Sequence, residues 1–427
     1  MIRRTMKLDP PPAALLASGQ FPEREPSDLP LLDSPAEGIP PVISTRAALD
    51  NAVIQLREGH GPVAVDAERA SGFRYGQRAF LVQLRRAGAG TFLIDPEAFD
   101  DLLDVNEALA DAEWILHAAH QDLPCLRELE LQPNTLFDTE LAARLAGLPR
   151  VGLAYVTETM LGVRLAKEHS AADWSMRPLP EDWLNYAALD VEVLIELRNQ
   201  LEKLLRGQKK WDLALEEFEY ERLKPGPQPR KDPWRRTHGL HQLKDKHQIL
   251  AVKELWEERE KVAQNKDRAP GRLLPDSAII AAARALPTTV PALLRTDGFR
   301  GRLASKEARR WVTAIARARN ATRFPPRTAR RSTMPPPRSW NDRFPEAAER
   351  YQTARWRLER DAQALGMPLE NLLAPAVLKE ISWEPPEVVT LDSVQEKLRE
   401  LGAREWQIRR TAAVITVAFL EPEPLEH

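Results

Sequence analysis

Two acidic side chains, Asp66 and Glu68, stand two residues apart in the segment PVAVDAER at 62–69. The segment is short, rich in valine and bounded by Gly61 and Gly72, which predicts a β-strand. Because side chains on a strand alternate between its faces, both carboxylates then lie on one face and repel each other unless a cation lies between them. The pair suggests a divalent-metal site, although such pairs also occur on ordinary surface strands.

Two later segments add further carboxylates. Asp122, in HAAHQDLPCL at 117–126, falls in the first turn of a predicted helix that follows a short strand. The alternative is that this carboxylate only complements the helix dipole. In WLNYAALDVEVLIEL at 183–197, Tyr186 and Asp190 are four residues apart and share one face of an amphipathic helix. An aspartate among apolar neighbours on a buried helix needs a partner.

Together these residues have the composition of a phosphoryl-transfer site. Four carboxylates can hold two divalent cations, Mg²⁺ or Mn²⁺, through hard oxygen ligands. Two such cations stabilise both the attacking and the leaving oxygen of a phosphoryl transfer. Tyr186, one helical turn from Asp190, can orient or deprotonate the attacking water.

The spacing of apolar residues predicts how the chain positions this site. Strands are expected at 62–69, 78–86, 90–96 and 113–118, with a hairpin turn at 87–90. Helices are expected at 47–58, 120–130, 138–147, 153–161 and 181–206. This mixture predicts an α/β domain in which helices flank a mixed sheet. Later segments are all-helical, with helices expected at 241–265, 276–286, 290–296 and 305–320 and a further helical unit at 346–420.

These patterns divide the 427 residues into six parts. They are a disordered arm (1–45), the α/β domain (46–210), a linker (211–233), a helical domain (234–320), a Pro- and Arg-rich linker (321–345) and a second helical domain (346–427). A single cysteine, Cys125, excludes an internal disulfide and fits a reducing cytoplasm. No signal peptide is expected, and the longest apolar run, near 412–420, is too short to span a membrane.

Charge is distributed unevenly along the chain, although its net value is only −2. Residues 1–223 carry 23 basic and 37 acidic side chains, a net −14, whereas residues 224–331 carry 26 and 10, a net +16. Residues 332–427 carry 12 and 16, a net −4. The asymmetry suggests metal in the first section and a polyanion on the second, and two solvated faces of opposite sign are the alternative.

The motifs VDAE, HQD and YAALD, in this order, resemble the three exonuclease motifs of the DEDD superfamily in its Tyr-containing branch. The segment DWSMRPLPEDWLNYAALDV at 173–191 is similar to the third motif of the ribonuclease D family, and the resemblance covers about 45–210. It implies a ribonuclease H-like fold with a mixed five-stranded sheet. It also implies that Tyr186 positions the nucleophilic water and that the metal ligands are Asp66, Glu68, Asp122 and Asp190.

The first helical domain carries a resemblance of its own. Its segments WRRTHGLHQL, LAVKELWEERE and NKDRAPGRLLPDSAIIAAARALP are similar to the HRDC domain, a small module shared by RecQ-type helicases and ribonuclease D. In such modules Lys and Arg face the phosphate backbone, which gives affinity without sequence preference. Residues 346–420 are expected to form a second, more divergent copy.

Four further residues are candidates for contact with substrate. Lys167 and Arg177 precede the third motif and can meet phosphates, but Arg177 can equally pair with a nearby carboxylate. His117 stands where many members of the superfamily have Asn. His120 lies two residues before Asp122, and a helix-start histidine bonded to a neighbour is its alternative.

The resemblance implies a 3′–5′ exoribonuclease that removes one nucleotide at a time and releases 5′-monophosphates from structured RNA such as tRNA precursors. A monomeric, cytoplasmic enzyme that does not bind membranes is expected. One alternative is the same chemistry on DNA ends, because no residue can be assigned to reading the 2′-hydroxyl. The other alternative is a catalytically idle RNA-binding scaffold.

Overall fold

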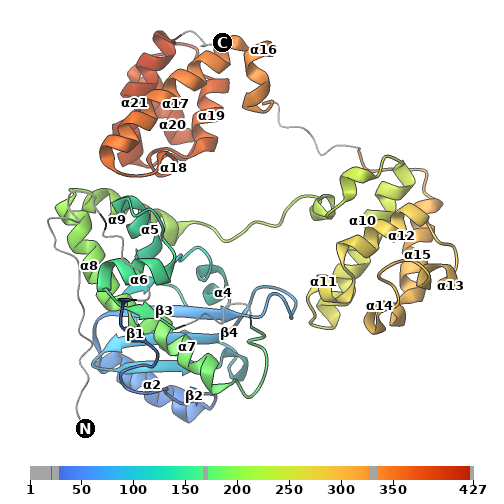
Figure 1. Cartoon of the computed structure of the whole chain (residues 1–427), viewed down its shortest axis with the longest axis horizontal. Coiled ribbons are helices and arrows are strands. Elements are labelled where there is room, and N and C mark those ends of the chain that lie inside the picture. Colours follow the sequence, from blue (N-terminus) through green and yellow to red (C-terminus); the bar gives the residue numbers. More distant parts are fainter. Residues whose placement is uncertain (1–20, 22–27, 167–171, 327–333, 424–427) are drawn as a thin grey trace.

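The computed structural model describes residues 21, 28–166, 172–326 and 334–423. Figure 1 shows an α/β domain, a middle helical domain (residues 233–326) and a C-terminal helical domain (residues 334–423). Lys167 lies outside the described residues, as do most of the proposed arm and the centre of the Pro- and Arg-rich linker.

The sheet of the α/β domain has six strands in the order β2-β5-β4-β3-β6-β7. Strands β3, β4 and β5 form an antiparallel meander, whereas β2, β6 and β7 pair with their neighbours in parallel. The four expected strands and the hairpin are confirmed. The strands are β2 (Val42–Ile43), β3 (His60–Arg69), β4 (Ala79–Ala87), β5 (Gly90–Ile94), β6 (Glu113–Leu116) and β7 (Thr135–Asp138).

The expectation of five strands was wrong, because both edge strands are short and depend on tertiary pairing. Strand β2 lies inside the arm that was expected to be disordered, where Val42 and Ile43 pair with Leu93 and Ile94. Within the same arm, β1 (Leu31–Leu32) pairs in parallel with β8 (Arg164–Leu165). The described part of residues 1–45 is therefore held against the α/β domain.

Helices cover both faces of the sheet. Val63 and Val65 of β3 pack against α2 and α3, whereas the intervening Ala64 packs with α5, α6 and α8 on the other face. The helix expected at 181–206 is divided at Val193, because α7 packs on β3, β4 and β5 whereas α8 packs on α5. The helices are α2 (Arg46–Glu58), α3 (Leu103–Ala108), α4 (Leu123–Arg127), α5 (Thr139–Ala146), α6 (Leu153–Leu161), α7 (Glu181–Glu192) and α8 (Leu194–Gly207).

The linker expected at 211–233 is mostly a helix, α9 (Trp211–Leu223). Phe218 of α9 is buried, and its ring centroid lies 4.7 Å from that of Phe137 on β7. The connection to the middle helical domain is therefore confined to residues 224–232.

The middle helical domain has its own core, in which Trp234 and Trp311 are buried. These two tryptophans are core residues and cannot stack on nucleic-acid bases. The main helices agree with the sequence pattern within a few residues. They are α10 (Lys246–Asn265), α11 (Pro270–Leu273), α12 (Asp276–Ala285), α13 (Val290–Leu294), α14 (Arg302–Lys306) and α15 (Ala308–Arg319).

The C-terminal helical domain begins within the segment that was expected to be a linker. Trp340 is buried, and its ring centroid lies 5.3 Å from that of Trp383, so residues 334–345 are packed and not extended. The helices are α16 (Trp340–Arg343), α17 (Pro345–Leu365), α18 (Leu369–Leu372), α19 (Pro375–Trp383), α20 (Leu391–Glu400) and α21 (Glu405–Leu420).

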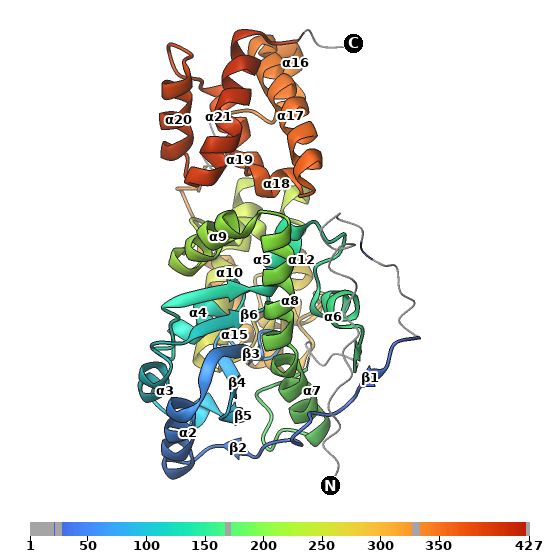
Figure 2. The same ribbon diagram turned by 90° about the vertical axis from the view of Figure 1, so that its left-hand side faces the viewer.

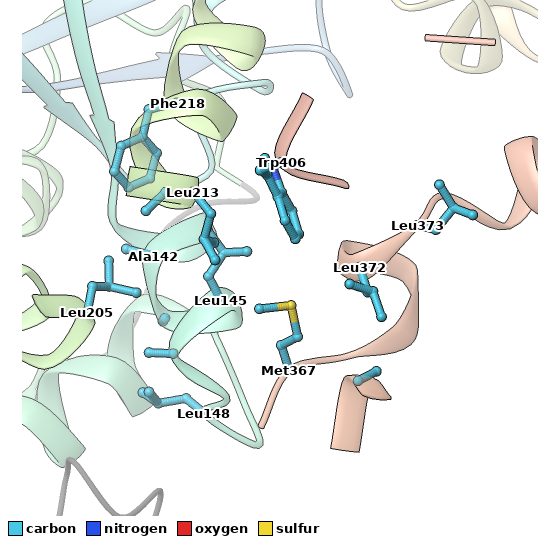
Figure 3. Close-up of a cluster of buried hydrophobic side chains, with 14 of the residues drawn as sticks. Ala142, Leu145, Leu148, Leu205, Leu213, Phe218, Met367, Leu372, Leu373 and Trp406 are labelled. Atoms are coloured by element: carbon cyan, nitrogen blue, oxygen red, sulfur yellow. The ribbon is translucent and has the colours of Figure 1, made fainter. Parts of the chain in front are cut away.

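The C-terminal helical domain shares one apolar core with the α/β domain (Figures 2 and 3). Met367 lies against Leu145, and Trp406 lies near Leu213. The Trp406 indole donates a hydrogen bond of 2.7 Å to Glu217 of α9. These contacts dock the C-terminal domain on α5 and α9. Within the described residues, we find no helix with the length and apolar character needed to cross a membrane.

Candidate active site

Strand β3 carries Asp66 and Glu68 at the centre of the sheet. The strand lies between β4 and β6, and Asp66 is in register with Gln83 of β4. Both carboxylates lie an even number of residues from Ala64 on the strand and therefore point to the same face as Ala64. The apolar Val63 and Val65 lie on the opposite face. The alternation predicted from the sequence is confirmed.

Helix α7 brings Asp190 to the same place, because it packs across β3 and β4. Asp66, Glu68 and Asp190 each offer one carboxylate oxygen, and these oxygens all lie within 4.8 Å of one another. Glu68 and Asp190 are largely buried. Hard, anionic oxygen ligands at this spacing suit a divalent cation.

The fourth predicted carboxylate, Asp122, lines the same pocket but is not part of this group of three. It occupies the N-cap position of α4 and accepts no capping hydrogen bond, which argues against a purely helix-capping role. Its Oδ1 instead lies 3.4 Å from Nη2 of Arg69. Sequence reasoning gave Arg69 no role, although the residue directly follows Glu68.

The buried carboxylates carry more negative charge than the surrounding chain neutralises. Burial raises the pKa of Asp66 to about 6. Burial, followed by the charges of Asp66 and Asp190, raises the pKa of Glu68 well above its usual range. Burial and then Asp66 do the same for Asp122. A divalent cation would neutralise this donor set.

Tyr186 lies one turn from Asp190 and makes a hydrogen bond with it. Burial first, and then the charges of Asp190 and Glu68, raise the pKa of the phenol. The ring centroid of Trp174 lies 6.4 Å from that of Tyr186, so the buried tryptophan packs against the tyrosine.

All five predicted catalytic side chains line one pocket of about 770 Å³. Pockets of roughly 300–1,000 Å³ typically hold small ligands. The volume therefore suits a nucleotide, and the pocket wall also includes Phe73 and His117.

The four candidate substrate contacts have different outcomes. His117 is in the pocket, where its Nδ1 lies 2.9 Å from Oγ1 of Thr139 and burial lowers its pKa to about 4. His120 is exposed and lines a neighbouring groove instead. Arg177 donates to both oxygens of Asp95, at 2.6 and 2.7 Å, which supports the alternative that it pairs with a nearby carboxylate. Lys167 lies outside the described residues.

Asp138, which sequence reasoning passed over, supports the segment that carries Asp122. Its buried carboxylate accepts hydrogen bonds from the backbone N–H groups of Ala118 and Ala119, at 3.1 and 2.8 Å. It also caps α5. Ala118 has a φ of 62°, which is unfavourable for a residue with a Cβ, so its conformation needs this support. The aspartate directly before the helical segment TELAARLA was the available signal.

Three protein families match successive parts of the chain. Residues 41–206 match a family described as 3′-5′ exonuclease, and residues 250–320 match the HRDC domain. Residues 333–419, which overlap the second helical domain expected at 346–427, match a family described as the 3′ to 5′ exonuclease C-terminal domain.

The matches between this chain and similar proteins cover different shares of those proteins' lengths. Exosome complex exonuclease RRP6 of Saccharomyces cerevisiae is 26% identical over 60% of this chain, which spans 37% of that protein. Ribonuclease D of Gluconacetobacter diazotrophicus is 32% identical over 66% of this chain and 72% of its own length. A protein from Bifidobacterium adolescentis with a known crystal structure is 39% identical in sequence to this chain. The two structures superpose with a TM-score of 0.83, over 92% of this chain and all of the other protein's chain.

Three observations agree with one another. They are the pocket with its carboxylates and tyrosine, the order of the three family matches, and the similarity to a ribonuclease D over most of that protein's length. On these grounds, the chain belongs to the ribonuclease D family.

Proposed function

We propose that this protein is a metal-dependent 3′–5′ exoribonuclease that releases 5′-monophosphates. The observation that carries the proposal is the convergence of three carboxylates, Asp66, Glu68 and Asp190, within 4.8 Å of one another in one pocket. Tyr186 and Asp122 line the same pocket. Two relatives similar to this chain support the proposal, because one is named a ribonuclease and the other an exonuclease.

The carboxylates supply the ligands that two Mg²⁺ or Mn²⁺ ions need. Asp66, Glu68 and Asp190 would hold them together with Asp122. When bound, such ions stabilise negative charge on the attacking and leaving oxygens of the phosphodiester. Tyr186 orients the attacking water through its hydroxyl, and the pocket holds the 3′-terminal nucleotide in line with that water.

The substrate class that we propose is the 3′ end of structured RNA, such as a tRNA precursor, cleaved by a monomer in the cytoplasm. The charge of the middle helical domain supports this proposal. The domain lies in the section of the chain with a net charge of +16, which favours binding of a polyanion such as RNA. A DNA exonuclease and an idle RNA-binding scaffold are the alternatives. Against the scaffold, all four carboxylates and the tyrosine are present in one pocket.

The test compares tRNA-like RNA with DNA of the same sequence, each labelled at the 5′ end. We expect a ladder of products shortened by single nucleotides from the 3′ end of RNA with Mg²⁺ or Mn²⁺, and none with EDTA. Asp66→Ala is the inactive control. Asp111→Ala, which removes an exposed carboxylate outside the pocket, is the matched active control. Faster cleavage of DNA would reassign the substrate, and binding without cleavage would support the scaffold.

A further inference from the structure

The loop that joins β3 to β4, residues 70–78, forms one wall of the active-site pocket. Ser71, Phe73 and Gln77 of this loop line the pocket together with Asp66 and Glu68. The loop begins with a tight turn in which the carbonyl of Ala70 accepts hydrogen bonds of 2.8 Å from the N–H groups of Phe73 and Arg74. Figure 1 shows α11 of the middle helical domain beside this loop.

Asp267, at the corner between α10 and α11, holds the centre of this loop. Its carboxylate accepts from the backbone N–H of Tyr75 at 3.2 Å and from Arg74 at 3.3 Å. It also receives two parallel hydrogen bonds from the Arg78 guanidinium, at 3.0 and 2.9 Å. A bidentate Arg–carboxylate pair fixes orientation as well as distance, so the loop and the domain are joined in one geometry.

Phe73 is held by the same domain through both its backbone and its ring. The carbonyl of Phe73 accepts a hydrogen bond of 3.0 Å from the N–H of Ala269, and Nε of Arg272 donates one of 2.6 Å to the carbonyl of Gly72. The Arg272 guanidinium lies over the ring, 3.9 Å from its centroid. A partly exposed aromatic ring on the pocket wall is therefore fixed in position from outside the α/β domain.

We propose that Phe73 stacks on an unpaired base at the 3′ end of the RNA, and that Arg272 and Asp267 hold it there. The proposal rests on the function proposed above and adds a substrate contact to it. Every base has a π-face, so an aromatic wall grips the terminal nucleotides of any sequence. A ring that served only to pack the two domains together would not need to line the pocket that contains the carboxylates.

The kinetic arm of the test compares Phe73→Leu, which removes the ring but keeps an apolar side chain, with Phe73→Tyr, which keeps the ring. On a short RNA oligonucleotide, Phe73→Leu should raise KM about tenfold or more with little change in kcat, and Phe73→Tyr should stay close to wild type. Phe324→Leu is the matched control, because Lys246 lies over the Phe324 ring, 4.5 Å from its centroid, but Phe324 is not in the pocket.

The fluorescence arm places 2-aminopurine, whose emission falls on stacking, at the 3′-terminal position. Binding is measured in an Asp190→Asn background, in which no cleavage is expected. Quenching on binding should be strong with Phe73 and largely lost with Leu at this position. Equal quenching and equal KM in the Phe73→Leu protein would overturn the proposal. Quenching without cleavage by the wild-type protein would instead count against the proposed function alone.

A second pair of variants tests the supporting role of the middle helical domain. Asp267→Asn should raise KM on the same short RNA, whereas Glu307→Gln should not. Glu307 pairs at 2.6 Å with Lys266, the neighbour of Asp267, so both changes remove one negative charge from the same region. Neither change removes a cation, so loss of phosphate contacts cannot explain a difference. If Phe73→Leu fails to fold, Arg272→Ala takes its place, and unchanged quenching in that variant would reject the support by Arg272.

Discussion

Nη2 of Arg69 lies 3.4 Å from Oδ1 of Asp122. The residue directly before Arg69 on the strand, Glu68, belongs to the group of three carboxylates. Two neighbours on β3 thus bring opposite charges to one pocket. A shift of the β3–β4 register between Glu68 and Arg69 accompanies this arrangement. Burial raises the pKa of Glu68 and Asp122, and Arg69 is the cation that opposes the rise.

Arg69→Gln is therefore expected to destabilise the metal-free protein. The buried carboxylates lose the opposing positive charge of Arg69. We therefore expect Tm to fall by about 3 °C, which corresponds to a loss of about 1 kcal/mol in the free energy of unfolding. Added Mn²⁺ should raise Tm more in the variant than in wild type, because the cation then has no competing guanidinium. Thermal melts with EDTA and with Mn²⁺ measure both effects, and an equal Mn²⁺ response would contradict this role of Arg69.

Asp66→Ala and Asp190→Asn should each nearly abolish cleavage while the protein stays folded, because each removes a ligand from the metal group. Asp190→Asn should also raise Tm in metal-free buffer, since the charge of Asp190 is one of those that raise the pKa of Glu68. Cleavage rates and melts in EDTA provide the two measurements. Activity within a few-fold of wild type would remove these residues from the active site.

Tyr186→Phe should lower kcat by about 10²-fold, the scale of a lost contact to the attacking water, with little change in Mn²⁺ affinity. The ring and its packing against Trp174 remain, so the fold should be unaffected. Isothermal titration with Mn²⁺ distinguishes the roles. A loss of Mn²⁺ affinity as severe as that of Asp190→Asn would place the hydroxyl among the metal ligands.

Mn²⁺ affinity should fall as the pH drops below about 6, because burial raises the pKa of Asp66 to about 6 and a protonated carboxyl is a poor ligand. The metal-free protein should respond in the opposite direction. Asp66, Glu68 and Asp122 have raised pKa values and bind more protons in the folded than in the unfolded state, so their contribution to stability should decrease as the pH rises from about 4 to 7. Titrations and melts at pH 5.5 and 7.5 measure both trends.

Removing the middle helical domain alone should weaken RNA binding and leave chemistry intact. Joining residue 224 to residue 334 with a flexible linker deletes most of the section with a net charge of +16, so the slope of log affinity against log salt should become shallower on tRNA-length RNA. Truncation after Leu223 is the wrong comparison, because it uncovers Leu145, Leu213 and Phe218, which share a core with the C-terminal helical domain. Equal salt slopes would mean that this domain does not touch RNA.

The convergence of the candidate site residues could largely be predicted because its signals are local in the sequence. Asp66 and Glu68 share a face by strand alternation, and Tyr186 and Asp190 by helical spacing, so neither pair needs knowledge of the fold. Arg69 and Asp122 are different, since their ion pair joins residues from two elements. No spacing rule predicts such a contact.

The errors in the fold have the same origin. Strand β2 has two residues, and its pairing with Leu93 and Ile94 is set by the sheet and not by the proline-rich segment around it. Helix α9 divides its apolar side chains between the α/β domain and the C-terminal helical domain. The contact of Asp267 with Arg78 spans 189 positions, so domain arrangement is not contained in any local pattern.

The shared core of the α/β and C-terminal helical domains can be completed only after the ribosome has translated the C-terminal domain. Phe218 and Leu213 belong to the same apolar cluster as Trp406, but Trp406 is translated almost 190 residues later than Phe218. At about 5–20 residues per second, the nascent α/β domain waits roughly 10–40 s with this face uncovered. During that interval the growing chain offers an apolar surface to chaperones and to neighbouring nascent chains.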